Sequence, residues 1–359
     1  MKTALVHDSI TQLGGAERVL EALHELYPEA PIFTLVYDQK LKEHFEGWTI
    51  VSSPLQYLYN IIPRFQWMLP FIPIALKFFD FSKFDLVISS SSVFAKNITV
   101  PKGVIHIDYC HSPARFLWSE SESYVHDEVP WLLRPIVKVF LTWMRKWDYQ
   151  KAQQVDFFIA NSDNIQKKIK LYYKRESLVI HPCIDAEKFY PSMPKEDYFL
   201  IAARLQIHKR IDLAIEAFNQ LGIALHVVGT GRDEQRLKNM ANEKIVFLGR
   251  VEDPILCNEY SAAKGFIFPQ DEDFGLTPLE ANAAGTAVIA YKKGGALETV
   301  IENKTGIFFD KLEVESLKDA VRKFNTINFN SEDLFEQADK FSKDNFKAKF
   351  EYFVNEKIK

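Results

Sequence analysis

Short apolar segments alternate with amphipathic helical patterns along most of this 359-residue chain. In one such pattern, apolar residues recur every three or four positions at Ala16, Val19, Leu20, Leu23 and Leu26, which is the spacing of a helix that buries one face. Strands that alternate with such helices predict parallel sheets covered by helices on both faces. The twelve expected strands are Thr3–His7, Ile32–Val36, Asp85–Ser89, Val104–Ile107, Asp156–Ala160, Leu178–His181, Phe199–Ala203, Ala224–Val228, Ile245–Leu248, Gly265–Phe268, Ala287–Tyr291 and Ile307–Phe309.

Twelve strands are too many for one compact sheet in a chain of this length, so the pattern predicts two Rossmann-like α/β domains. The segment from His181 to Pro194 is rich in proline and has little periodicity, which indicates the seam between them. We therefore expect a first domain over residues 1–181 and a second over residues 182–335. Residues 336–359 are charged, helical in pattern and free of strands, and we expect them to pack back on the first domain.

Composition narrows the environment in which the chain works. The net charge is −4 at pH 7, so the bulk charge gives no attraction to nucleic acid. Three cysteines stand far apart in the sequence, which suits free thiols in a reducing cytosol. The N-terminus has a strand pattern and not that of a signal peptide. The apolar stretch Trp67–Phe79 is too short and too interrupted to span a bilayer. We expect a cytoplasmic protein.

The segment Glu272–Glu280 is the most informative local feature, and it follows an expected buried strand that stops at Pro269. Glu272 then lies on a loop at the carboxyl end of a parallel strand, where open α/β sheets bind ligands. The amides of Gly275-Leu276-Thr277 lie at a helix start, where free N–H groups and the helix dipole favour phosphate. Glu280, one turn into that helix, is placed to reach a second part of the same ligand.

Two other loops carry groups that suit a phosphate. Arg204 and Lys209 follow the Phe199–Ala203 strand, and two fixed cations suit a diphosphate, although a solvated basic loop has the same composition. Gly14 and Gly15 follow the first strand and open the first helix, where the backbone can approach an anion closely. An ordinary strand-to-helix turn explains that glycine pair equally well.

Three further motifs have a functional and a structural interpretation. Gly229-Thr230-Gly231 lacks the third glycine of a dinucleotide fingerprint, which argues against a nicotinamide site. The Asp-x-Asp form of residues 271–273 occurs in metal sites, but acidic loop residues also commonly face water. His111 follows the Val104–Ile107 strand in an expected interdomain loop, and it also fits a packed or solvent-facing histidine.

Aromatic residues gather between Gln56 and Phe84 and again between Val129 and Trp147, with arginine and lysine interspersed. Such segments can rest on an anionic bilayer surface. They can equally form a helix that crosses a sheet and packs in the core. The apolar stripe of the second segment consists of Trp131, Leu132, Ile136, Val139, Phe140 and Trp143.

Taken together, these motifs resemble the GT-B retaining glycosyltransferases of family GT4, also called group 1, along nearly the whole chain. The Tyr109–Trp118 stretch, with Arg145–Asp148, looks most like bacterial mannosyltransferase-type members that build surface polysaccharides such as O-antigen. The resemblance implies an α/β GT-B fold, in which two Rossmann-like domains face a central cleft and a C-terminal helical segment returns to the first domain.

The resemblance also implies roles for the motif residues that hold the nucleotide. Arg204 and Lys209 would hold the donor diphosphate, and Gly15, beside Gly14, would approach the phosphates from the first domain. The base would lie against the loop around Val251. One departure from the family pattern is Ala203, which stands where glycine often precedes the arginine. It should be tolerated if its backbone is not left-handed.

Other motif residues would hold sugars. The resemblance places Glu272 and the backbone of Phe274, Gly275 and Leu276 on the hydroxyls of the transferred sugar, and Glu280 on the nucleotide ribose. His111 would lie across the cleft near the sugar.

The expected reaction is therefore hexose transfer with retention from a nucleotide sugar, GDP-mannose being favoured over UDP-sugars. The acceptor would be a lipid-linked saccharide in surface polysaccharide biosynthesis, such as that of lipopolysaccharide, at the cytoplasmic face of an anionic membrane. Arg204 and Lys209 can neutralise the leaving phosphate, so no metal and no other cofactor is expected. The alternatives are a UDP-sugar-dependent enzyme with a soluble acceptor, a phosphorylase or synthase on free sugars, and a non-catalytic protein that binds a sugar nucleotide.

Overall fold

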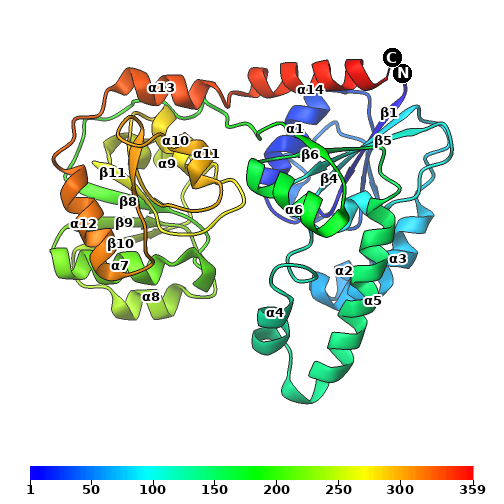
Figure 1. The fold of residues 1–359 in the computed structure, drawn as a ribbon, viewed down its shortest axis with the longest axis horizontal. Coiled ribbons are helices and arrows are strands. Elements are labelled where there is room, and N and C mark those ends of the chain that lie inside the picture. The colour runs from blue at the N-terminus through cyan, green and yellow to red at the C-terminus, as the bar shows by residue number, and fades with distance from the viewer. Residues whose placement is uncertain (359) are drawn as a thin grey trace. The chain divides into compact units, whose positions relative to one another are not determined.

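The structure is a computed structural model that describes residues 1–358. It divides into two compact units (Figure 1): Met1–His181 together with the residues from Lys347 onward, and Pro182–Phe346. Each unit is built on one sheet in which every described strand pair is parallel. The architecture of two parallel-sheet α/β units is the one that the strand–helix alternation predicts.

The sheet of the first unit has the strand order β3-β2-β1-β4-β5-β6-β7. The strands are β1 (Thr3–His7), β2 (Ile32–Thr34), β3 (Ile50–Ser52), β4 (Leu86–Ser91), β5 (Ile105–Cys110), β6 (Phe157–Ala160) and β7 (Ser177–Val179). The helices are α1 (Gly15–Leu26), α2 (Leu55–Ile61), α3 (Ile72–Ala75), α4 (Ser121–Glu128), α5 (Arg134–Ala152) and α6 (Asp163–Tyr173), with 3-10 turns η1 (Gln39–Leu41), η2 (Phe65–Phe71), η3 (Leu76–Phe78), η4 (Ala95–Asn97) and η5 (Trp131–Leu133).

The sheet of the second unit has the order β10-β9-β8-β11-β12-β13. The strands are β8 (Tyr198–Ala202), β9 (Ala224–Val228), β10 (Ile245–Gly249), β11 (Gly265–Phe268), β12 (Val288–Tyr291) and β13 (Gly306–Phe309). The helices are α7 (Ile211–Leu221), α8 (Glu234–Met240), α9 (Asp253–Ala262), α10 (Thr277–Ala283), α11 (Ala296–Thr299), α12 (Val314–Phe324) and α13 (Ser331–Asp339), with one 3-10 turn, η6 (Ile207–Lys209), before α7.

Alternating strand residues divide the core of the second unit into two layers. Leu200 packs with residues of α9, α10 and α13, whereas its neighbours Phe199 and Ile201 pack with α7 and α12 on the other face. Successive side chains of a strand point to opposite faces, so a fully buried strand of this kind is apolar at every position. This is why the sequence shows continuous apolar runs here.

The C-terminal segment returns to the first unit later than the sequence analysis expected, at Lys347 and not at residue 336. The last helix, α14 (Lys343–Lys357), forms an ion pair from Lys347 to Glu25 of α1 (3.0 Å) and packs Phe353 edge-on against Phe157. Residues 336–346 stay in the second unit, because Ala338 and Phe341 are buried in its core.

Each sheet contains a point at which the strand order reverses. In the first sheet the chain moves outward from β1 to β3 and then starts again at β4 on the other side of β1. In the second sheet the same reversal lies between β8 and β11. Loops that leave the carboxyl ends of such strand pairs diverge, and ligands of open α/β sheets bind there.

Candidate functional site

Lys209 and Glu272 meet at the reversal point of the second sheet. Lys209 ends η6 in the loop after β8, and Glu272 lies in the loop after β11. Their side chains form an ion pair, and both are mostly buried, with exposed fractions of 13% and 16%. The topology thus brings together a cation and a carboxylate that the sequence analysis selected separately.

The Gly229-Thr230-Gly231 turn supports the Arg204 loop from the side of β9. Leu205 donates its backbone N–H to the carbonyl oxygen of Thr230 (3.0 Å). A Cβ atom on Gly231 would lie 2.1 Å from the Leu205 carbonyl oxygen, and one on Gly229 would lie 1.9 Å from that of Ala203. Glycine is required because two backbones touch here, which gives this motif a structural reason unrelated to a nicotinamide.

A second glycine pair, Gly294-Gly295, supports the Glu272 loop from the side of β12. Gly295 donates its N–H to the carbonyl oxygen of Glu272 (2.8 Å), and a Cβ atom on Gly295 would lie 2.1 Å from the Phe274 Cα. Lys293 pairs with Asp271 at 3.0 Å. This support was not predicted from the sequence, although a Gly-Gly pair in the loop between a strand and the next helix, as at Gly14-Gly15, is a signal for it.

The helix start that follows is arranged as the sequence analysis expects. Helix α10 begins at Thr277, and Gly275, Leu276 and Thr277 are partly exposed. Gly275 has φ +90°, and a Cβ atom there would lie 2.7 Å from the ring of Phe268, so only glycine fits. Phe274 is buried and packs against Phe341.

Glu280 lies inside the second unit, where only 3% of its surface is exposed. Its carboxylate accepts a hydrogen bond from the Tyr260 hydroxyl at 2.9 Å. Tyr260 and the start of α10 therefore fix the position of a carboxylate that the sequence analysis assigned to the nucleotide ribose.

Arg204 and Val251 lie on further loops at the same edge of the sheet. Arg204 is exposed in the loop after β8, and Ala203 before it lies outside the left-handed region, as its tolerance requires. Val251 follows β10 and is partly buried. Gly229 donates its N–H to the Gly249 carbonyl oxygen (2.8 Å), which ties the Val251 loop to the turn after β9.

His111 follows β5, next to the reversal between β1 and β4, and belongs to a chain of side-chain contacts that links it to β4 and β1. Its Nε2 is 2.8 Å from the Ser90 Oγ on β4, and that oxygen is 3.1 Å from Nδ1 of His7 on β1. Nε2 of His7 faces Glu17 Oε1 at 3.7 Å. Burial, and then the neighbouring His7, lower the pKa of His111 to about 3. His111 is therefore neutral near pH 7. His7 and Ser90 were not predicted from the sequence as site residues.

Gly14 and Gly15 stand beside this chain. Gly14 is the residue before α1, with an extended backbone, and a Cβ atom there would lie 3.1 Å from Glu17 Oε2. Gly15 is exposed at the start of the helix. The pair thus keeps the first turn of α1 open above a buried glutamate.

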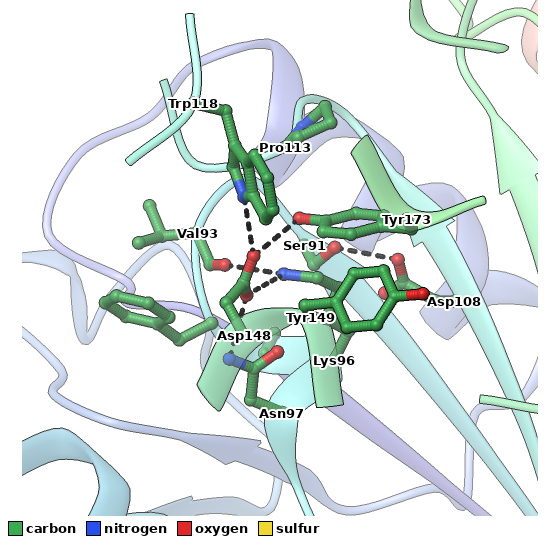
Figure 2. A network of polar contacts seen from close by, with 12 residues as sticks. Ser91, Val93, Lys96, Asn97, Asp108, Pro113, Trp118, Asp148, Tyr149 and Tyr173 are labelled. Atoms are coloured by element: carbon green, nitrogen blue, oxygen red, sulfur yellow. Dashed lines mark hydrogen bonds and ion pairs between the residues drawn. The ribbon is translucent and has the colours of Figure 1, made fainter. Parts of the chain in front are cut away.

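Asp148 fixes the far end of the loop that begins at His111 (Figure 2). The buried carboxylate accepts hydrogen bonds from Lys96 Nζ (2.7 Å), Asn97 Nδ2 (2.9 Å), Trp118 Nε1 (2.8 Å) and the Tyr173 hydroxyl (2.9 Å). Burial alone would lower the pKa of the Lys96 ammonium, but the Asp148 charge raises it above its usual range. The two sequence stretches 109–118 and 145–148 are therefore packing partners.

The two aromatic segments are only partly core. Leu141 and Met144 of α5 are buried, but the stripe residues Trp131 and Ile136 are 72% and 69% exposed. Core packing therefore does not account for most of that stripe. Exposed apolar side chains also lie in η2, α3 and η3, at Trp67, Phe71, Ile74 and Phe78. Within residues 1–358, no helix has both the length and the apolar character needed to cross a bilayer.

Two of the three carboxylates of residues 271–273 are paired with lysines. Asp271 pairs with Lys293 and Glu272 with Lys209, and no group of three or more His, Cys, Asp or Glu side chains within residues 1–358 is placed to hold a metal ion.

Comparison with known proteins gives consistent matches. The family model described as Glycosyltransferase Family 4 matches residues 13–188, and that described as Glycosyl transferases group 1 matches residues 185–344. The alpha-1,3/1,6-mannosyltransferase ALG2 of Dictyostelium discoideum is 25% identical over 309 residues, which are 70% of this chain and 68% of that protein.

A second relative is the GDP-mannose-dependent alpha-(1-6)-phosphatidylinositol monomannoside mannosyltransferase of Mycobacterium tuberculosis. It is 34% identical over 135 residues, which are 34% of this chain and only 33% of that protein. Among solved structures, Anabaena HepE in complex with UDP superposes with a TM-score of 0.71 at 17% identity, covering 99% of this chain and 100% of that one. The two family models together span residues 13–344, and the structural likeness extends over both units. The chain therefore belongs to the group 1, family 4 glycosyltransferases and has their GT-B fold.

Proposed function

We propose that this glycosyltransferase moves a hexose, with retention and without a metal, from a nucleotide sugar to a lipid-linked or oligosaccharide acceptor in surface polysaccharide biosynthesis. The observation that carries the proposal is the Lys209–Glu272 pair at the reversal point of the second sheet. Mannose from GDP-mannose is the favoured donor. The names of two relatives support it, one as a mannosyltransferase and the other as GDP-mannose-dependent.

The chemistry of transfer explains why these residue types are needed. The bond from the anomeric carbon to the diphosphate oxygen breaks, and negative charge develops on the leaving phosphate. Arg204 and Lys209 neutralise that charge, together with the N–H groups at the start of α10. The acceptor oxygen bonds to the anomeric carbon on the same face, and its proton passes to the departing phosphate. No side chain has to act as a nucleophile.

The remaining residues position the donor in this proposal. Glu272, with the backbone of residues 274–276, holds the sugar hydroxyls, and Glu280 holds the ribose. Val251 lies against the base, and Gly14 and Gly15 leave room for the phosphates. His111 contacts the transferred sugar. As a neutral ring it does not repel the positive charge that develops on the anomeric carbon.

Replacement of Lys209 or Glu272 tests the reaction directly. We expect Lys209→Ala and Glu272→Ala to lower the rate of mannose transfer from GDP-mannose by about 10²–10³, the usual cost of losing one group that stabilises a transition state. Lys264→Ala is the matched control, because it removes a lysine from an exposed ion pair with Asp197 in the same unit. Unchanged transfer in both site variants would refute the proposal.

UDP-sugars are the second candidate donors, because HepE, which shares the fold, was crystallised with UDP. Transfer assays with GDP-mannose and UDP-hexoses in parallel separate the two. Transfer from any of these donors also excludes a non-catalytic sugar-nucleotide-binding protein. A preference for free sugars over a lipid-linked acceptor would favour a synthase.

We further propose that the protein binds the inner face of an anionic membrane through the η5–α5 segment and the η2–α3 segment of its first unit. Both segments pack their inner sides on one core cluster and expose apolar side chains outward. Lys138 and Lys146 are exposed on α5, and lysines near the surface favour anionic lipid.

Trp131→Ala combined with Ile136→Ala should reduce flotation with anionic vesicles. Leu171→Ala, an exposed leucine on α6, should not. Flotation that is equal for all variants would contradict this surface.

A further inference from the structure

The starting observation is the chain of polar contacts from Glu17 through His7 and Ser90 to His111. His7 and Glu17 are 3% and 4% exposed, and Ser90 is 1% exposed. His7 and Ser90 are register partners on the neighbouring strands β1 and β4. The strand pairing therefore fixes the spacing of the two central members.

The chemistry of Ser90 limits this chain to two arrangements. A serine hydroxyl carries one hydrogen, and the side-chain acceptors that Ser90 Oγ contacts are the two ring nitrogens. Ser90 therefore donates either to His7 Nδ1 or to His111 Nε2 and accepts from the other ring. In the first arrangement His7 carries its hydrogen on Nε2, toward Glu17. In the second, the bare Nε2 lone pair of His7 faces the Glu17 carboxylate.

Electrostatics selects the first arrangement. An ionised carboxylate only accepts hydrogen bonds, so at 3.7 Å the Glu17 oxygen attracts an N–H on His7 Nε2 and repels a lone pair there. Low exposure on both sides strengthens this preference. The Ser90 hydrogen then points to His7, and the Ser90 oxygen accepts from Nε2–H of His111.

We infer that Glu17, His7 and Ser90 are positioning residues that hold His111 as the tautomer with its hydrogen on Nε2, which leaves Nδ1 as a hydrogen-bond acceptor. The inference rests on the proposed function only in one respect, that the acceptor at Nδ1 receives a hydroxyl hydrogen of the transferred sugar. His111 then has the wrong polarity to donate to that sugar.

The rest of the His111 environment keeps the ring and backbone in place. The His111 backbone N–H donates to the Ser91 carbonyl oxygen (2.8 Å), and the His111 carbonyl oxygen accepts a hydrogen bond from Asn161 Nδ2 (3.0 Å). The Tyr109 ring meets the imidazole edge-on. With the backbone fixed on both sides, Ser90 decides which ring nitrogen carries the hydrogen.

The tautomer can be measured without any substrate. Long-range ¹H–¹⁵N NMR of the full-length protein with ¹⁵N-labelled histidine distinguishes the two ring nitrogens, and His111→Gln identifies the His111 signals. We expect a neutral His111 protonated on Nε2 in the wild type. Glu17→Gln and Ser90→Ala should each convert this into a mixture of tautomers. Glu21→Gln is the matched control, since Glu21 pairs with His44 on the exposed side of the same helix.

Kinetics supplies the second measurement. Glu17→Gln and Ser90→Ala should lower kcat for sugar transfer about 10-fold to 100-fold, as for partners that orient metal-bound histidines, with KM for the donor little changed. Glu21→Gln should leave both constants at wild-type values. If the Ser90→Ala variant is too unstable to assay, Glu17→Gln still tests the inference, because this replacement keeps the size of the side chain.

Two results would overturn the inference. One is a wild-type His111 protonated on Nδ1. That tautomer would result if Ser90 accepted a hydrogen bond from His7 Nδ1 and donated its own hydrogen to His111 Nε2. The other is an unchanged tautomer in both Glu17→Gln and Ser90→Ala. The NMR result is readable even if the donor is not GDP-mannose, so a wrong donor assignment and a wrong tautomer are told apart.

Discussion

His106 and Asp108 show how a single buried hydroxyl can couple two titrating residues. Both lie on β5, and Ser89 Oγ is 2.8 Å from His106 Nε2 and 2.6 Å from Asp108 Oδ1, to which it donates. Burial, with Lys151 and Lys96 adding to it, lowers the pKa of His106 to about 3. Burial raises the pKa of Asp108 to about 7, against the opposing charge of Lys96.

The two shifts have opposite effects on stability. The folded protein favours neutral His106, so that stability is present above pH 6.5 and is lost as the pH falls from 6.5 toward 3. The folded protein also favours protonated Asp108, so that stability is present below pH 3.8 and is lost as the pH rises through about 7. Between pH 5 and 6.5 the two contributions largely cancel in the wild type.

Single replacements should reveal each contribution. Between pH 7 and 5, the wild type should lose about 2 kcal/mol of unfolding free energy relative to His106→Gln, at about 1.4 kcal/mol per pH unit below 6.5. Relative to Asp108→Asn it should gain a similar amount over the same range. Urea unfolding at pH 5, 6 and 7 measures both. Parallel pH profiles for the three proteins would contradict the assignment.

At the scale of elements, Asp148 joins four segments that are far apart in the sequence. It lies on α5 and accepts hydrogen bonds from η4, from Trp118 after β5 and from Tyr173 at the end of α6. Arg145, one turn earlier on α5, donates from Nε to the Leu117 carbonyl oxygen (2.7 Å). The His111–Trp118 loop is thus held at both ends by buried polar groups.

Loss of one partner of the buried Lys96–Asp148 ion pair should destabilise the protein more than loss of both partners together. Asp148→Asn leaves the Lys96 charge buried without its counter-ion, and we expect a loss of about 3–5 kcal/mol. The double variant Lys96→Met with Asp148→Asn should lose less than the sum of the single changes, as a double-mutant cycle by urea unfolding will show. The exposed pair Lys170–Glu176 is the control, with a coupling of about 0–1 kcal/mol. Additive losses at Lys96 and Asp148 would mean that they are not coupled.

The elements also show where sequence patterns stop being informative. Lys209 and Glu272 were selected from separate loops, and strand order alone brought them together. By contrast, β3 was not expected, because Val51 and Ser52 are exposed at a sheet edge and no apolar run forms. His7 and Ser90 were missed because a strand pattern does not state which residues become register partners.

For the whole molecule, the missed feature was the place where the chain changes units. Helix α14 begins in the second unit and continues into the first. A helical apolar pattern states that one face is buried, but it does not state against which core. Phe341 and Phe353 have the same character in the sequence, yet the first packs near Phe274 and the second near Phe157.

The two units should respond differently to a donor. Each unit has its own core, and the candidate donor-binding residues are distributed over both of them. All six tryptophans lie within Met1–His181, so tryptophan fluorescence reports the first unit. Arg204, Lys209, Glu272 and Glu280 lie in the second. A donor present at about 100 times its Kd should stabilise the unit that binds it by about 2.7 kcal/mol.

We therefore expect GDP-mannose to separate the urea transitions seen by two probes. Far-UV circular dichroism follows both units, and its later phase should move to higher urea, while the tryptophan transition moves less. Lys209→Ala should abolish the separation, and Lys264→Ala should retain it. An equal shift in both probes would show that the units unfold as one cooperative body, because the binding energy of a ligand held mainly by one unit would then stabilise the other to the same extent.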